Sequence, residues 1–191
     1  MGHWPLDIET PKPLLVYGYG NPGRQDDGVG VALAEELEAW ARAEGVEGVV
    51  FDTNYQLNAE DALAVAEARA VVFIDAAAEG AEPFEFRRLK PRGEIAFSTH
   101  AMSPESVLAL AEELYGATPP AWLLAIRGHS WEPNEPATPA ALAHLAAAAA
   151  FLRKWIRPPR SGSAESGAPG HPCEALRPGP DGGDHCRRER E

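Results

Sequence analysis

The sequence predicts an α/β protein with three layers, in which helices cover both faces of a mixed, mostly parallel sheet of five strands. Short, continuous apolar runs are typical of strands that are buried on both faces. Segments with helical periodicity lie between these runs, and right-handed crossovers place such helices on the two faces of a parallel sheet. One further segment alternates between apolar and polar residues, which predicts an antiparallel fourth strand in the same sheet.

The first half of the chain is predicted to form a βαβαβ unit. Its strands are expected at residues 14–17, 49–51 and 70–75. The helices that connect them are expected at residues 29–42 and 59–68, and in the second helix we expect Leu63 and Ala66 to face the core. Short connections between these elements favour neighbouring parallel strands.

The alternating segment FEFRRL, residues 84–89, follows the third strand without a helix between them. Because a short loop cannot make a parallel crossover, this strand is expected to run antiparallel. We expect it at or near an edge of the sheet, paired through a turn around residues 79–83.

Two later helices are marked by a capping residue followed by proline, at Ser103 and at Thr138. The first of these helices is expected to end at Gly116, and a fifth strand is expected at residues 122–126. The apolar face of the last helix is expected to include Leu142, Leu145, Ala149 and Leu152.

Composition divides the chain into a polar N-terminal leader at residues 1–12, a single domain at residues 13–157 and a tail at residues 158–191. The tail is rich in proline, glycine and charge and is expected to be disordered. Both cysteines, Cys173 and Cys186, lie in it, so the domain has no thiol for a disulfide or for redox chemistry.

The net charge of −12 argues against nucleic acid or an anionic membrane as a partner. The N-terminus lacks the basic and apolar regions of a signal peptide, and no apolar run approaches the ~20 residues that span a bilayer. We therefore expect a cytoplasmic protein without membrane insertion.

A glycine-rich turn follows the first strand, and two adjacent carboxylates follow the turn. Gly18, Gly20 and Gly23 spell the GxGxxG pattern of dinucleotide-binding proteins. Asp26 and Asp27, however, would repel a pyrophosphate at the start of the helix, where the helix dipole instead favours ionised carboxylates. The alternatives are a cation held by these carboxylates and a helix cap formed by one of them.

The turn GYGNPGRQDDGVGV, residues 18–31, resembles the opening motif of the hydrogenase maturation proteases. The segments VVFIDAAAEG, STHAMSPESVLALAEELYG and IRGHSWEPN resemble later segments of that family in the same order. The resemblance covers about residues 14–151. It implies an endopeptidase that removes the C-terminal extension of a nickel-iron hydrogenase large-subunit precursor, with nickel already present in that precursor.

Carried onto this sequence, the residues that the family uses to contact nickel are Asp27, Asp75 and His100. Two carboxylates and one imidazole suit a borderline divalent ion such as nickel and leave coordination positions open. The same three residues are the expected catalytic site, and no nucleotide is expected. Residues 13–157 contain no GxSxG elbow, no cysteine and no HExxH motif, which disfavours the other hydrolase classes.

Several alternatives remain at this point. Asp75 is also compatible with a turn cap and His100 with an exposed loop histidine, and His129 follows the fifth strand closely enough to flank the site. His144 is expected to lie far from the strand ends. A non-catalytic nickel-binding assembly factor and a nucleotide-binding enzyme that uses the glycine turn are the alternative functions.

Overall fold

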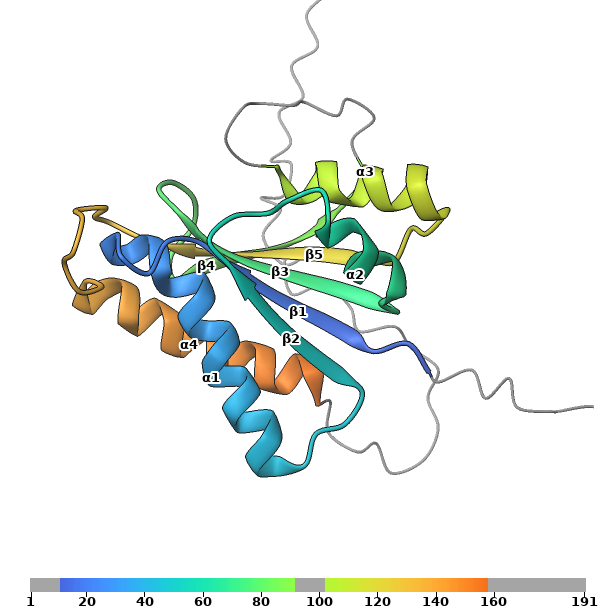
Figure 1. Cartoon of the computed structure of the whole chain (residues 1–191). Helices are drawn as coiled ribbons and strands as arrows, with labels where there is room; N and C mark the ends of the chain where they lie inside the picture. The colour runs from blue at the N-terminus through green and yellow to red at the C-terminus, as the bar shows by residue number, and fades with distance from the viewer. Residues whose placement is uncertain (1–10, 92–101, 158–191) are drawn as a thin grey trace, which may run out of the picture. The chain divides into compact units, whose positions relative to one another are not determined.

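A five-stranded sheet with the strand order β2-β1-β3-β5-β4 forms the centre of the fold (Figure 1). Its strands are β1 (Leu14–Tyr19), β2 (Val49–Asn54), β3 (Ala70–Ala77), β4 (Phe84–Leu89) and β5 (Ala121–Arg127). All neighbouring pairs are parallel except β4 and β5, so the predicted mixed α/β sheet is confirmed. The computed structural model describes residues 11–91 and 102–157, and His100 and the cysteine-containing tail lie outside these ranges.

Two pairs of helices cover the two faces of this sheet (Figure 1). On one face lie α1 (Val29–Glu44) and α4 (Pro139–Ile156), and on the other lie α2 (Asp61–Glu67) and α3 (Pro104–Tyr115). Each face has its own apolar core, because the strand residues alternate between the two sides. Leu14 and Val16 pack towards α1, whereas Leu15 and Tyr17 pack towards α2. None of the described helices is long and apolar enough to cross a membrane.

Strand β4 is antiparallel and lies at the sheet edge, as predicted, but its partner is β5 and not β3. Phe84 pairs with Ile126, and Leu89 pairs with Ala121. The two strands differ in burial: Leu124 and Ile126 of β5 are fully buried, whereas every second position of β4 is exposed at its start. β5 therefore holds the interior position between β3 and β4, and the half-exposed β4 forms the edge.

Leu63 and Leu142 were expected to face the core, and both expectations are wrong. Leu63 is 46% exposed and Leu142 is 51% exposed. In α4 the buried positions run from Ala141 through Leu145 to Leu152, so Leu142 lies about 100° round the helix from that stripe. Alanine forms much of the α4 face because the helix packs closely against the sheet and α1.

The predicted helix starts at Ser103 and Thr138 are confirmed. The hydroxyl of Ser103 accepts a hydrogen bond from the backbone N–H of Ser106 at 3.1 Å. The hydroxyl of Thr138 accepts one from the N–H of Ala141 at 3.2 Å. Helix α1 begins differently, through the short 3-10 helix η1 (Gln25–Gly28), which carries Asp26 and Asp27.

Candidate functional site

The start of α1 lies unusually close to the carboxyl ends of β1 and β3. A Cβ atom added to Gly30 would lie 2.5 Å from the carbonyl oxygen of Tyr19 and 2.6 Å from that of Ile74. A Cβ atom added to Gly18 would clash with the carbonyl oxygen of Gly30. The missing side chains therefore allow the helix to start directly against both strand ends, which brings η1 to Asp75.

Two of the three predicted site residues lie on elements that contact each other, η1 and β3. Asp27 lies in η1 and Asp75 lies near the end of β3, and both side chains are half-buried. The negative charge of Asp27 raises the pKa of Asp75. The third predicted residue, His100, lies outside the described residues.

The Asp75 carboxyl group has a pKa raised to about 6, and burial is the main cause. The hydroxyl of Tyr19 and the backbone N–H of Ala76 favour the carboxylate and oppose this effect, with the Ala76 N–H donating to Oδ1 at 2.8 Å. The charge of Asp27 adds to the increase. A carboxyl group with this pKa changes its charge just below neutral pH, and a nearby cation would stabilise its ionised form.

Tyr19 belongs to this site although the sequence analysis did not single it out. It is the last residue of β1, and its hydroxyl interacts with the Asp75 carboxylate. Burial and the negative charge of Asp75 raise the pKa of Tyr19 far above its ordinary value, so the hydroxyl keeps its proton and acts as a donor. The signal in the sequence was a large polar side chain between two glycines directly after a buried strand.

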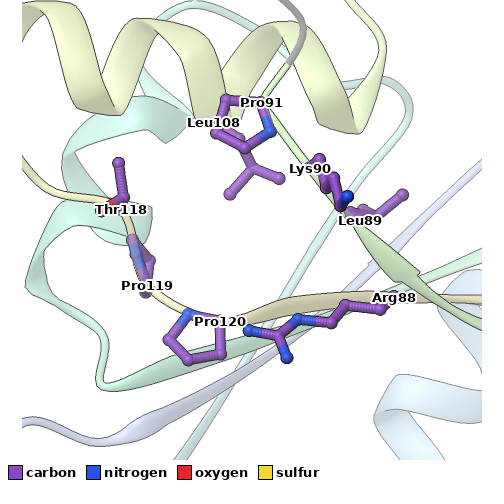
Figure 2. Close-up of a pocket in the computed structure, with 8 residues that line it drawn as sticks. All are labelled: Arg88, Leu89, Lys90, Pro91, Leu108, Thr118, Pro119 and Pro120. Atoms are coloured by element: carbon purple, nitrogen blue, oxygen red, sulfur yellow. The ribbon is translucent and has the colours of Figure 1, made fainter.

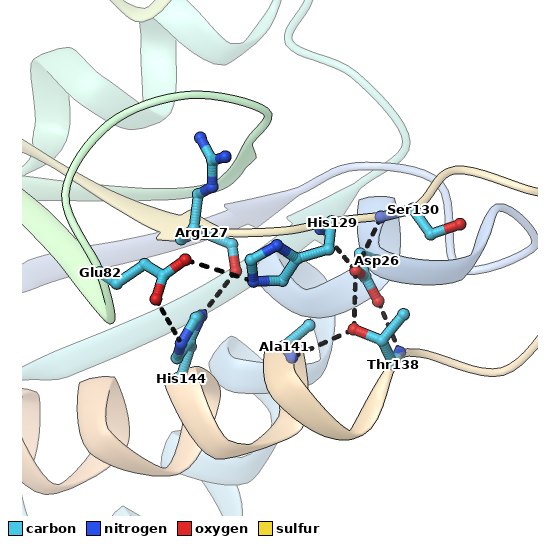
Figure 3. Close-up of polar contacts among 8 residues, drawn as sticks. All are labelled: Asp26, Glu82, Arg127, His129, Ser130, Thr138, Ala141 and His144. Atoms are coloured by element: carbon cyan, nitrogen blue, oxygen red, sulfur yellow. Dashed lines mark hydrogen bonds and ion pairs between the residues drawn. The ribbon is translucent and has the colours of Figure 1, made fainter.

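Asp26 has a structural role, and its carboxylate points to the loop between β5 and α4 (Figure 3). It is fully buried, and its carboxylate accepts the backbone N–H groups of His129, Ser130 and Thr138 at 2.8, 3.1 and 2.6 Å. The Thr138 hydroxyl donates to it at 2.9 Å. Burial alone would raise the pKa of Asp26, but these four donors outweigh it and lower the pKa. The carboxylate thus joins η1 to the loop between β5 and α4.

Two backbone N–H groups of the glycine-rich turn donate to side chains within the turn and the short helix that follows it. The N–H of Asn21 donates to Oδ2 of Asp27 at 3.2 Å, and the N–H of Gly23 donates to the Asn21 side chain at 2.8 Å. Gly20 has a φ of +133°, and the position of its absent Cβ is taken by the carbonyl oxygen of Asp27. The turn is therefore folded around the Asp27 side chain.

His129, which was expected to flank the site, and His144, which was not, lie next to each other, with ring centroids 5.5 Å apart (Figure 3). The prediction that His144 lies far from the strand ends is wrong. Its Nδ1 is 2.8 Å from the carbonyl oxygen of Arg127, the last residue of β5. The start of α4 returns to the sheet because Thr138 is anchored to Asp26.

A pocket of about 280 Å³ lies at the opposite end of β5 from these residues (Figure 2). It is bounded by the end of β4, by helix α3 and by the loop before β5, and its lining residues include Arg88, Leu108 and Pro120. Neither Asp27 nor Asp75 contributes to it. Among residues 11–91 and 102–157, no group of three or more histidine, cysteine, aspartate or glutamate side chains is placed so that it could hold a metal ion.

The fold is similar to solved structures of hydrogenase maturation enzymes. One is a NiFe hydrogenase maturation protease from Thermococcus kodakarensis KOD1, with 24% identity, a TM-score of 0.60, and coverage of 76% of this chain and 92% of that one. A hydrogenase maturating endopeptidase from E. coli matches with 22% identity and a TM-score of 0.57 over 76% of this chain and 92% of that one. A hydrogenase 2 maturation peptidase from a Thaumarchaeota archaeon matches with 22% identity and a TM-score of 0.56 over 76% and 98%. At these identities the likeness establishes the fold. No protein-family model and no curated protein sequence matches the chain.

Proposed function

We propose that this chain is an endopeptidase that removes the C-terminal extension of a nickel-loaded hydrogenase large-subunit precursor. The observation that carries the proposal is that η1, which carries Asp27, packs against the end of β3, which carries Asp75. Open α/β sheets bind their ligands beyond the carboxyl ends of the strands, which is where these carboxylates lie. The shared fold with three hydrogenase maturation enzymes supports the same assignment.

In this proposal, Asp27, Asp75 and His100 recognise the nickel ion that the precursor presents. Two carboxylates held together by the fold repel each other, and burial adds to the cost of ionising Asp75. A divalent cation relieves both costs, so the pair favours a metal-bearing partner over a neutral one. The donor set of oxygen and imidazole nitrogen suits nickel, and its open coordination positions leave room for ligands from the precursor.

The glycine turn supports this function over nucleotide binding. The N–H groups of Asn21 and Gly23 are directed to acceptors within the turn, and one of these acceptors is Asp27 itself. A pyrophosphate at this position would have to displace the carboxylate that the turn surrounds. A thermal-shift measurement with NAD and ATP tests this point. A nucleotide that binds and is present at 100 times its dissociation constant would stabilise the folded chain by about 2.7 kcal/mol. We expect no stabilisation by either nucleotide.

The direct test of the activity is to incubate the full-length chain with a hydrogenase large-subunit precursor in its nickel-loaded and nickel-free forms. We expect a shorter product from the nickel-loaded precursor only, measured by intact mass. An unchanged precursor in the presence of folded, soluble protein contradicts the endopeptidase. If calorimetry then shows that the chain binds nickel, or binds the loaded precursor without cleaving it, the non-catalytic assembly factor is the correct alternative.

A further inference from the structure

Strand β4 forms one edge of the sheet, and among the described residues only β5 pairs with it (Figure 1). An edge strand presents a row of backbone N–H and C=O groups to any chain that can extend the sheet. We propose that two copies of this protein associate through this edge, with β4 of one copy antiparallel to β4 of the other. The proposal does not depend on the peptidase activity.

The pairing of β4 with β5 determines which backbone groups of β4 face outwards. Antiparallel strands alternate between residue pairs that exchange hydrogen bonds and pairs that do not. The carbonyl oxygen of Pro83 accepts the N–H of Arg127 at 3.2 Å, so the odd-numbered residues of β4 direct their backbone groups towards β5. The even-numbered residues Phe84, Phe86 and Arg88 therefore direct their N–H and C=O groups away from the sheet.

The side chains of β4 alternate between the two faces of the sheet. Phe86 contacts the aromatic rings of α4, whereas Arg87 lies on the α3 side and pairs with Glu105 at 3.2 Å. Glu85 lies on the same face as Arg87 and is exposed. Within residues 11–91 and 102–157, no cation is paired with Glu85. This carboxylate is therefore available to a cation of another chain.

One register of two antiparallel β4 strands brings these opposite charges together. When Phe86 lies opposite Phe86 of the second copy, Glu85 lies opposite Arg87 of the second copy, and the reciprocal pair forms at the same time. A shift by two residues in either direction would instead place Glu85 opposite Glu85 or Arg87 opposite Arg87. Opposite charges across a strand pair are stabilising and like charges are destabilising, so the sequence of β4 favours the first register.

The same register also suits the backbone and the other face of the sheet. The outward-facing residues then form the hydrogen-bonded pairs, in which Phe86 faces Phe86 and Phe84 faces Arg88 of the second copy. Both phenylalanines are half-buried, and the Arg88 guanidinium already lies 5.8 Å from the ring centroid of Trp122. Aromatic pairs and a cation beside an aromatic ring are favourable neighbours across two strands. The contact is two-fold symmetric, so it closes after two copies.

The opposite edge of the sheet does not offer this complementarity. Strand β2 carries Asp52 as its only charged residue, so two β2 strands cannot form a pair of opposite charges. Charges on an edge strand usually prevent association between copies. In β4 the alternation of one acidic and one basic residue on the same face has the reverse effect in the register described.

The test measures the mass of the full-length protein by sedimentation equilibrium at several concentrations, with a reductant that keeps Cys173 and Cys186 from cross-linking. We expect the mass to rise from the 20.5 kDa of one chain towards twice this value. Glu85→Arg and Arg87→Glu should each self-associate at least about tenfold more weakly, because both place like charges opposite each other. Asp52→Arg, the matched control on the other edge strand, should associate as the wild type does.

An equal mixture of Glu85→Arg and Arg87→Glu should restore association. Every arginine of one variant then faces a glutamate of the other, and native mass spectrometry will identify the one-to-one species. Circular dichroism checks the fold of each variant, and Glu85→Arg with its Asp52→Arg control remains decisive if Arg87→Glu does not fold. The proposal is overturned if the wild type keeps the mass of one chain, if Glu85→Arg associates as tightly as the wild type, or if the mixture of folded variants forms no one-to-one species.

Discussion

Replacing Asp75 with asparagine should change how the stability of the protein depends on pH. The substitution keeps the shape of the side chain and removes its ability to ionise. Burial and the charge of Asp27 hold the pKa of Asp75 near 6 in the folded chain, compared with 3.8 as its ordinary value. The folded protein therefore binds this proton more tightly than the unfolded chain does.

The sign and size of the effect follow from this difference. A raised carboxyl pKa means that the wild-type protein gains stability from this group as the pH falls through about 6, and that the gain levels off near the unfolded value. The difference between the folded and unfolded pKa of Asp75 corresponds to about 3 kcal/mol in the free energy of unfolding. Partial exposure of the side chain reduces this contribution to about 2 kcal/mol. At a pH above about 7, Asp75→Asn should be more stable than the wild type, and this advantage should disappear towards about pH 4.

Urea unfolding of both proteins across this pH range, with a chelator present, measures the difference directly. Subtracting the two curves cancels the titration of the groups that do not interact with Asp75. Asp52→Asn is the matched control, because Asp52 is exposed at the end of β2 and accepts the next backbone N–H at 2.8 Å, as Asp75 does. The reasoning is refuted if the wild-type and Asp75→Asn curves run parallel from about pH 4 to pH 8.

Three further predictions concern the scaffold. Asp26→Asn should lower the free energy of unfolding by roughly 2–4 kcal/mol at neutral pH, because the amide cannot accept from all four donors. The pKa of Asp26 is lowered in the folded chain, so this loss of stability should become smaller in acid. Urea unfolding of both proteins at neutral and at acidic pH measures the difference. Gly30→Ala should lower the free energy of unfolding by roughly 1–3 kcal/mol, because the added methyl group meets two backbone carbonyls. Gly23→Ala should lower it clearly less in the same unfolding assay, because its methyl group meets one side-chain oxygen at 3.2 Å. Equal losses in the two variants would contradict the packing argument. Ser103→Ala should lower the free energy of unfolding by about 1 kcal/mol, because the helix loses its N-terminal cap. A melting temperature equal to that of the wild type would contradict this.

The elements of the fold were predictable because their signals are local. Apolar runs indicated β1 and β3, and capping residues marked the starts of α3 and α4 within one residue. The partner of β4 was not predictable from its own alternating pattern. It depends on β5, a strand more than 30 residues later in the chain, which takes the place beside β3.

The site was predictable only in part. Asp27 follows β1, and Asp75 lies near the end of the neighbouring parallel strand β3, so the pairing of these strands places both residues at the same edge of the sheet. The role of Asp26 could not be read from the sequence, because its four donors lie more than 100 residues away. The same long-range contact places His144 beside His129, against the expectation that a histidine on an alanine-rich helix is remote from the strand ends.

The central claim is that the Asp27 and Asp75 carboxylates together recognise the metal-bearing precursor. Its most direct test is the intact mass of a nickel-loaded large-subunit precursor after incubation with wild-type protein, Asp75→Asn or Asp52→Asn. We predict the shorter product with the wild type and with Asp52→Asn, and an unchanged precursor with Asp75→Asn. Cleavage by Asp75→Asn at the wild-type rate would contradict the claim.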